Sequence, residues 1–174
     1  TVVKFPRWPF DKFTHADRRL GTQMKATGEV MALDRTLEGA LLKAFRSLEL
    51  GPDYPLVRSV EELPNDELIT GLKQGVDSRL LLLFAALRRG ITSSELASWT
   101  GIQPFFIKKM ANLVAQEKEL GQGLTPERLL AAKRLGFTDT AVSFFSGWPQ
   151  AEIRNWRQGL GCCPGYKMVD SAAG

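Results

Sequence analysis

The fold is decided by the stretch from Ser78 to Gly101, SRLLLLFAALRRGITSSELASWTG. The sequence predicts a helix over 78–89 with Asp77 as its cap, and the Leu-rich middle is typical of a helix buried on most sides. The residues Thr92-Ser-Ser-Glu95 fit a capping box, in which hydroxyl and carboxylate satisfy free backbone N–H groups at the start of the next helix. The apolar run Leu80–Leu87 is far shorter than the roughly 20 residues that cross a bilayer. We therefore expect buried helices and no membrane span.

This pattern recurs 46 residues later in the chain. Arg134–Thr138 repeats Arg88–Thr92, and the match continues through Gly101 with Gly147 and Ile107 with Ile153. Each copy reads as a helix ending in Gly, a short Thr-capped helix, a turn containing Gly, and a further helix. Prolines mark other helix starts, at positions 104, 126 and 149. The sequence predicts an all-α domain built from related helical hairpins.

The first 35 residues have a different character. Strand-like segments at Val2–Phe5 and near Thr27–Met31 are separated by irregular sequence, and a helix with one apolar face follows Thr36 and stops before Gly51-Pro52. We place a domain boundary near residue 50, with a piece of an α+β neighbour over 1–49 and the helical domain over 50–174. The early segment crowds together aromatic side chains that we expect to pack against something outside it, namely Phe5, Trp8, Phe10 and Phe13.

Charge and reactive residues exclude several classes of protein. The net charge is +4, from 23 Lys and Arg against 19 Asp and Glu, and the excess lies before residue 50. His15 is the only histidine, and we expect it in a polar surface or capping role. Cys162 and Cys163 are adjacent, so they cannot bridge without severe strain, and no second Cys or His cluster completes a metal site. We expect no catalytic residue and no metal in this chain.

One alternative is a helix-turn-helix module that binds nucleic acid. Ala97, Gly101 and Ile107 have the spacing with which two such helices cross. Base readout, however, needs side chains such as Arg, Asn or Gln early in the second helix, where this chain has Gln103-Pro-Phe-Phe106. The bulky Phe pair indicates burial, and residues 50–174 are nearly neutral, so we favour a scaffold without nucleic acid.

The aromatic residues of the helical part are candidates for a self-association surface. Tryptophan and other large aromatic side chains dominate the energetics of protein interfaces. Lys108 and Lys109, and Glu117-Lys118-Glu119, are interpreted as solvated helix faces. The candidates for the oligomer interface are Trp99, Phe105, Phe106 and Trp148.

Three blocks together resemble one family. They are Val2–Arg7, then Gln23–Ala32 followed by Arg35-Thr36, and Tyr166–Asp170. These blocks are similar to the large subunit of carbamoyl-phosphate synthase, and weaker matches over 99–106 and 132–137 keep the same order. The resemblance implies that residues 1–49 end the carboxyphosphate-forming ATP-grasp unit. Residues 50–174 would be the helical connection or oligomerisation domain.

The resemblance also implies what the complete enzyme does. Such a ligase makes carbamoyl phosphate from bicarbonate, glutamine-derived ammonia and two ATP, with Mg²⁺ or Mn²⁺, for pyrimidine and arginine synthesis. Its partners would be its own synthetic domains, other large subunits and a glutaminase small subunit, in the cytoplasm. The ATP-grasp loops and metal-binding carboxylates are absent from these residues, so we expect the segment to hold no cofactor and to be inactive alone.

Glu29 is the one residue that the resemblance connects with the reaction path. It matches a Glu that lines the passage carrying carbamate towards the second active site, where a carboxylate needs a hydrogen bond or a cation. A structural role, with Glu29 bound to a turn N–H or to Arg35, stays open, and Lys25 and Arg35 are expected only to hold this block. Near the end, Ser171 and Ala172 stand where the family usually has Thr and Cys.

Overall fold

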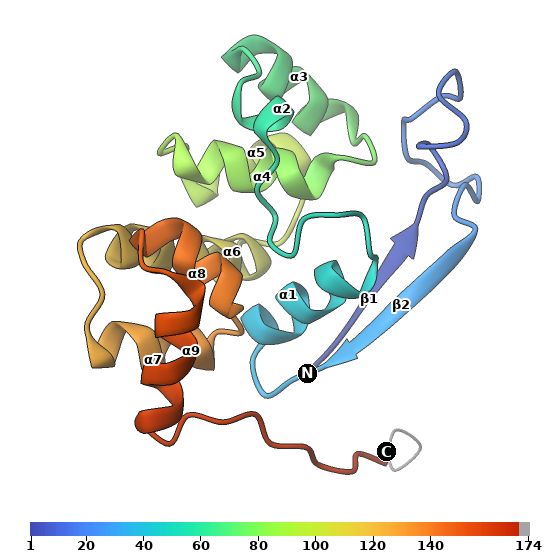
Figure 1. Cartoon of the computed structure of the whole chain (residues 1–174). Coiled ribbons are helices and arrows are strands. Elements are labelled where there is room, and N and C mark those ends of the chain that lie inside the picture. Colours follow the sequence, from blue (N-terminus) through green and yellow to red (C-terminus); the bar gives the residue numbers. More distant parts are fainter. Residues whose placement is uncertain (171–174) are drawn as a thin grey trace.

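The computed structural model describes residues 1–170 and is mostly helical, with a short strand pair at its N-terminus (Figure 1). Strands β1 (Val2–Arg7) and β2 (Gly28–Leu33) precede helix α1 (Leu37–Ser47). The other helices follow in the order α2 (Arg58–Glu61), α3 (Asn65–Gln74), α4 (Arg79–Arg88), α5 (Ser93–Thr100), α6 (Pro104–Gly121), α7 (Pro126–Arg134), α8 (Asp139–Ser146) and α9 (Gln150–Gly159). The predicted helical fold with a short β tail is confirmed.

The strand pair is an antiparallel ribbon that packs on α1. Its register pairs Val2 with Leu33 and Arg7 with Gly28, and the long connection over 8–27 closes it. Helix α1 contacts both strands on one side and α6 on the other (Figure 1). Helices α2 to α5 lie on one side of this junction and α7 to α9 on the other, with α6 between them. The ribbon is thus joined to the helical body through α1.

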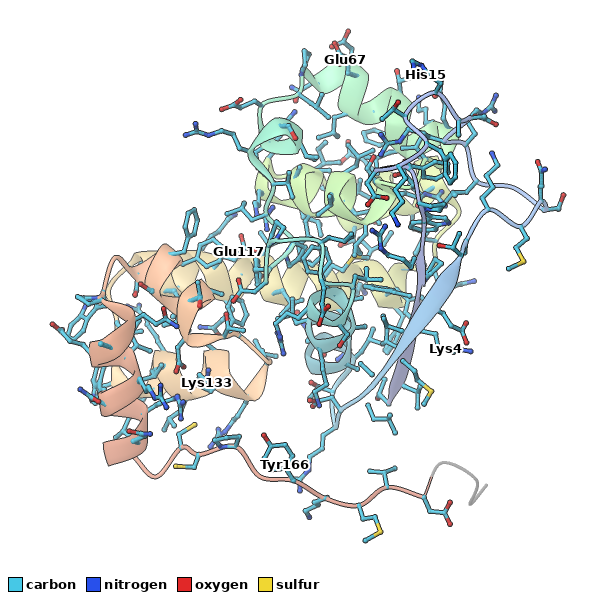
Figure 2. All side chains as sticks on the ribbon, turned by 45° about the vertical axis from the view of Figure 1, so that its right-hand side comes forward. Lys4, His15, Glu67, Glu117, Lys133 and Tyr166 are labelled. Carbon is cyan, nitrogen blue, oxygen red and sulfur yellow. The ribbon has the colours of Figure 1, made fainter. Side chains whose placement is uncertain are left out.

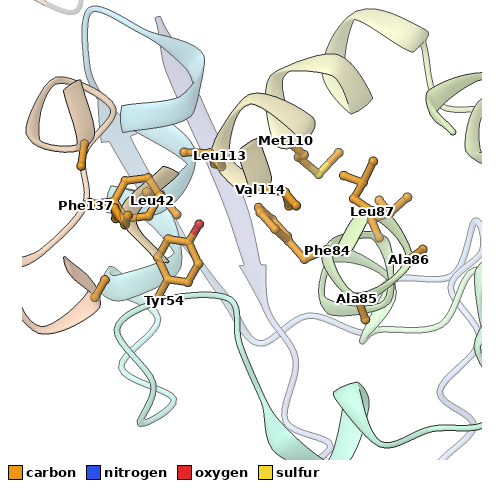
Figure 3. Packing of buried hydrophobic residues seen from close by; sticks show 14 of the residues in the cluster. Leu42, Tyr54, Phe84, Ala85, Ala86, Leu87, Met110, Leu113, Val114 and Phe137 are labelled. Atoms are coloured by element: carbon orange, nitrogen blue, oxygen red, sulfur yellow. The ribbon is translucent and has the colours of Figure 1, made fainter. Parts of the chain in front are cut away.

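Helix α4 lies in the core, as its Leu-rich sequence predicts. Its residues 82–87 are all buried, and Phe84 is fully enclosed beside α6 (Figure 3). The predicted cap is wrong, because Ser78 occupies the N-cap position and Asp77 binds Arg18 instead, with Arg18 Nε 2.8 Å from Asp77 Oδ1. A guanidinium offers the carboxylate two charge-assisted hydrogen bonds, which are stronger than a single bond to a backbone N–H.

The 46-residue repeat is confirmed in the backbone. Gly90 and Gly136 end their helices at φ values of 85° and 91°, and the turn glycines Gly101 and Gly147 have φ values of 69° and 74°. Positive φ costs glycine little, which explains its recurrence at these positions. The hydroxyls of Thr92 and Thr138 each accept a hydrogen bond from the third backbone N–H of the next helix. Only the first copy has the complete capping box, because Ala141 replaces Glu95 in the second.

The junction between α1 and the second repeat is very close. A Cβ atom added to Gly136 would lie 3.0 Å from the Cα of Gly39. The Arg46 guanidinium donates to the Gly136 carbonyl at 3.0 Å, and the fully buried Leu42 of α1 belongs to the helical core. Two glycines therefore set how near α1 can approach the turn between α7 and α8.

Candidate functional site

The first turn of α6 presents two phenylalanine rings to solvent. Phe105 is 58% exposed and Phe106 is 45% exposed, and their rings meet edge to face with centroids 5.4 Å apart. The expectation that this pair is buried is wrong, because Ile107, at 0% exposure, takes the core position of the turn. The 100° step of a helix then places its two predecessors away from that stripe. Lys109 Nζ lies 5.7 Å from the Phe105 ring centroid, over its face.

A second aromatic cluster lies at the turn between α8 and α9. Trp148 is exposed and stacks on Trp156, with ring centroids 5.3 Å apart. Phe144 is also strongly exposed and was not a sequence candidate. The repeat holds the signal that could have found it, because position 144 corresponds to the exposed Ser98 of the first copy.

The structure therefore separates the four interface candidates. Trp99 is half-buried against the core, with Lys73 Nζ 5.8 Å from its ring centroid. Phe105 and Phe106 form one pair, and Trp148 belongs to the other cluster. The start of α6 exposes hydrophobic rings where a helix-turn-helix would present base-reading polar groups.

Glu29 lies on β2 and is paired with a cation across the ribbon. Its Oε1 is 2.6 Å from Lys4 Nζ, and both side chains are more than half exposed (Figure 2). Arg35 is exposed and is not the partner of Glu29. The Lys25 ammonium instead holds the connection between the strands, donating to the Asp17 and Arg19 carbonyl oxygens at 2.9 and 2.6 Å.

A buried polar network connects the linker between α1 and α2, residues 51–57, with the core. Arg88 Nε donates to Glu117 Oε2 at 2.8 Å, Tyr54 Oη donates to Glu117 Oε1 at 2.8 Å, and Arg88 NH1 contacts Glu61 Oε1. Burial and the charge of Glu117 raise the pKa of Tyr54 far above its ordinary range. Burial acts to lower the pKa of Arg88. The hydrogen bonds to Glu117 and its negative charge outweigh burial, so the pKa of Arg88 is raised.

The interpretation of Glu117 as part of a solvated face is wrong. Its side chain is 5% exposed and lies near the middle of the molecule (Figure 2). Such a carboxylate is tolerated in a core only because Arg88 and Tyr54 supply a charge and hydrogen bonds. The network joins the 51–57 linker, α2, α4 and α6.

The second repeat has its own ion cluster. Asp139 at the start of α8 lies 2.8 Å from Lys133 Nζ and 2.9 Å from Arg157 Nε. Burial acts to raise the pKa of Asp139, but the hydrogen bonds from Lys133 and Arg157 prevail and lower it. This cluster connects α7, α8 and α9.

The remaining sequence candidates lie at the surface. His15 is exposed on the connection between the strands (Figure 2), Cys162 is half-buried and Cys163 is exposed. Tyr166 is exposed on the extended C-terminal segment, while Ser171 and Ala172 lie outside the described residues.

Within residues 1–170, no group of three His, Cys, Asp or Glu could hold a metal ion. None of the helices described is both long and apolar enough to cross a membrane.

Comparison with known proteins decides the family. Residues 29–161 match the model of the carbamoyl-phosphate synthetase large chain, oligomerisation domain. The chain belongs to this family. It is 44% identical to the carbamoyl phosphate synthase large chain of Methanothrix thermoacetophila over 172 residues, and 43% identical to that of Caldanaerobacter subterraneus over 173 residues. The arginine-specific large chain of Halalkalibacterium halodurans is 44% identical over 176 residues.

The match covers nearly all of this chain but a small part of its relatives. Each comparison spans 99% of the chain, yet only 16–17% of the large chain that it matches. The family match over residues 29–161 spans α1, the buried network and the helical repeats.

Proposed function

We propose that this chain is the connecting and self-association segment of a cytoplasmic carbamoyl-phosphate synthase large chain. The observation that carries the proposal is the match to the oligomerisation domain over residues 29–161. In this proposal, residues 1–49 end the carboxyphosphate unit and residues 50–174 form the oligomerisation domain. The close junction of α1 with the Gly136 turn supports a fixed geometry between them.

The contact surface that we propose is the start of α6. Phe105 and Phe106 expose adjoining rings on a well-anchored helix, because Ile107, Met110 and Leu113 of the same helix are buried. Burying two rigid aromatic rings costs little side-chain entropy and removes a large apolar area from water. Trp148, at the turn between α8 and α9, is a second contribution to self-association, and Trp99 lies beside the core as a supporting residue.

In the complete large chain this segment would serve a ligase without supplying its chemistry. The reaction would join ammonia from a glutaminase small subunit with bicarbonate, using ATP and Mg²⁺ or Mn²⁺ held by other domains. We propose that Glu29 lines the carbamate passage. Its pairing with Lys4 supports this role, because a carboxylate facing a protein-walled passage needs a hydrogen bond or a cation and Lys4 supplies the cation.

The test is light scattering after size exclusion over a concentration series. We expect the chain to dimerise with rising concentration, and the double variant Phe105→Ser, Phe106→Ser to remain a monomer with unchanged helical content. Phe13→Ser is the matched control, since Phe13 is 62% exposed but lies in the connection between the strands. It should associate like the unmodified chain.

Three results would count against this assignment. A chain that stays monomeric at high micromolar concentration would remove the self-association role. Dimers that survive in the double variant would move the contact to another surface, with Trp148→Ser as the next variant. Loss of association in Phe13→Ser would show that the early aromatics, and not α6, make the contact.

A further inference from the structure

The Glu38 carboxylate lies where α1 meets α6, close to the proposed contact surface (Figure 1). Its side chain is 3% exposed, and its Oε1 is 3.3 Å from Lys109 Nζ of α6. The same oxygen accepts a hydrogen bond from Asn112 Nδ2 at 2.9 Å. A carboxylate buried to this degree needs a cation or hydrogen-bond donors to stay charged. Helix α1 thus places a negative charge against the first turns of α6.

Lys109 connects this buried carboxylate with an exposed ring. Its Nζ lies over the Phe105 ring, 5.7 Å from the centroid, and its side chain is 33% exposed. Among residues 1–170, Glu38 is the one carboxylate that pairs with Lys109. A lysine side chain has much rotamer freedom, so it stays over one ring only where another contact fixes its ammonium group. Glu38 supplies that contact.

Glu38 depends on Lys109 in turn. Its second oxygen, Oε2, is buried and has no hydrogen-bond partner in the described part of the chain. Burial acts to raise the pKa of Glu38, but the hydrogen bonds from Asn112 and Lys109 prevail and lower it. The carboxylate is therefore charged at neutral pH, and Lys109 is the cation that balances it.

The ion pair changes what it costs to cover the Phe105 ring. A surface that packs around this ring takes the neighbouring Lys109 ammonium out of water as well. Burying an unpaired ammonium group is costly, whereas a nearby carboxylate offsets much of that cost. Glu38 therefore favours docking on Phe105 although it is itself enclosed and cannot touch the docking surface.

We propose that Glu38 is a positioning residue of the self-association surface, which fixes the Lys109 ammonium over Phe105 and balances its charge when a second copy docks. This inference rests on the self-association proposed above. Because Glu38 belongs to α1, the N-terminal unit contributes to a contact that α6 makes. By thermodynamic linkage, packing of α1 on α6 and self-association strengthen each other. A movement of α1 away from α6 weakens the association.

The test compares dissociation constants of self-association, from light scattering, in variants of the complete 174-residue chain. Glu38→Gln keeps the shape of the side chain and should weaken association at least about tenfold, because docking then buries an unpaired ammonium group. The double variant Glu38→Gln, Lys109→Met removes both charges and should return to within about threefold of the unmodified chain. Glu119→Gln is the matched control, since it breaks the ion pair with Arg128 near the other end of α6 and should change nothing.

Unchanged association of Glu38→Gln, or a double variant no better than the single one, would overturn the proposal.

Proton NMR of the dilute, monomeric chain separates this inference from self-association itself. The ring current of Phe105 should displace the ε-methylene protons of Lys109 upfield from those of Lys118, which is exposed on the same helix. Glu38→Gln should remove the displacement, and Glu119→Gln should keep it. No displacement in the unmodified chain, or its persistence in Glu38→Gln, would overturn the positioning role. A chain that shows the displacement but never associates would instead overturn the proposed self-association.

Discussion

Replacing Arg88 by Met should destabilise the chain by about 3–5 kcal/mol, because it strands a buried carboxylate. Arg88 binds Glu117 through two nitrogens, at 2.8 and 2.9 Å, and also reaches Glu61 and the Pro55 carbonyl. In the variant, the Glu117 carboxylate keeps only the Tyr54 hydroxyl at 2.8 Å. A domain of ordinary stability, about 5–15 kcal/mol, would lose at least about a fifth of its unfolding free energy.

Urea unfolding followed by far-ultraviolet circular dichroism measures this loss. The midpoint should fall while the slope with urea stays constant, because the variant unfolds the same surface. The triple variant Arg88→Met, Glu117→Leu, Tyr54→Phe removes three polar members of the network and leaves the partly exposed Glu61. It should recover most of the loss, since an apolar replacement of a buried ion pair is often neutral. A single variant within about 1 kcal/mol of the unmodified chain would refute the view that Glu117 depends on Arg88.

Two further perturbations test the second repeat. Gly136→Ala should lower the free energy of unfolding in urea by about 1–3 kcal/mol, because the residue has a φ of 91° and its new Cβ would lie 3.0 Å from the Cα of Gly39. An unchanged urea midpoint would contradict the close contact. Asp139→Asn should lower stability by about 1–3 kcal/mol at pH 7, through weaker bonds to Lys133 and Arg157. Because the pKa of Asp139 is lowered on folding, this stabilisation is present above about pH 4 and lost as the pH falls through the folded pKa. The difference between the two proteins should therefore shrink below about pH 4, and a constant difference down to about pH 2 would exclude this cause.

Local signals allowed the helical architecture to be predicted. The capping box at Thr92 and Glu95 and the glycine turns depend on residues within a few positions of one another, and the repeat shows the same kinds of local signal a second time, 46 residues later. The structure confirms them. The short helix α2 went unpredicted, because its four residues carry no periodicity and no side-chain cap. Short elements of this kind are fixed by tertiary contacts, here the bond from Arg88 to Glu61.

Two of the errors, at Asp77 and Glu117, share one physical cause, which is a partner far away in the sequence. Asp77 looks like a helix cap until Arg18, 59 positions earlier, offers a stronger bond. Glu117 sits in a charged run that is typical of a solvated face, yet Arg88 and Tyr54 draw it into the core. Neither pairing has a local signature. The proposed contact residues were identified from their type, whereas their exposure required the helix packing to be known.

Helix α1 connects the N-terminal ribbon with the helical body. With a boundary near residue 50, α1 belongs to the N-terminal unit while its side chain Leu42 is fully buried in the helical core. Glu38 of the same helix is also buried, and its Oε1 accepts a hydrogen bond from Asn112 Nδ2 of α6 at 2.9 Å. Helix α1 therefore contacts both the ribbon that carries Glu29 and helix α6, which exposes Phe105. On the function proposed above, a copy that docks on the start of α6 would be held at a defined distance and angle from the ribbon.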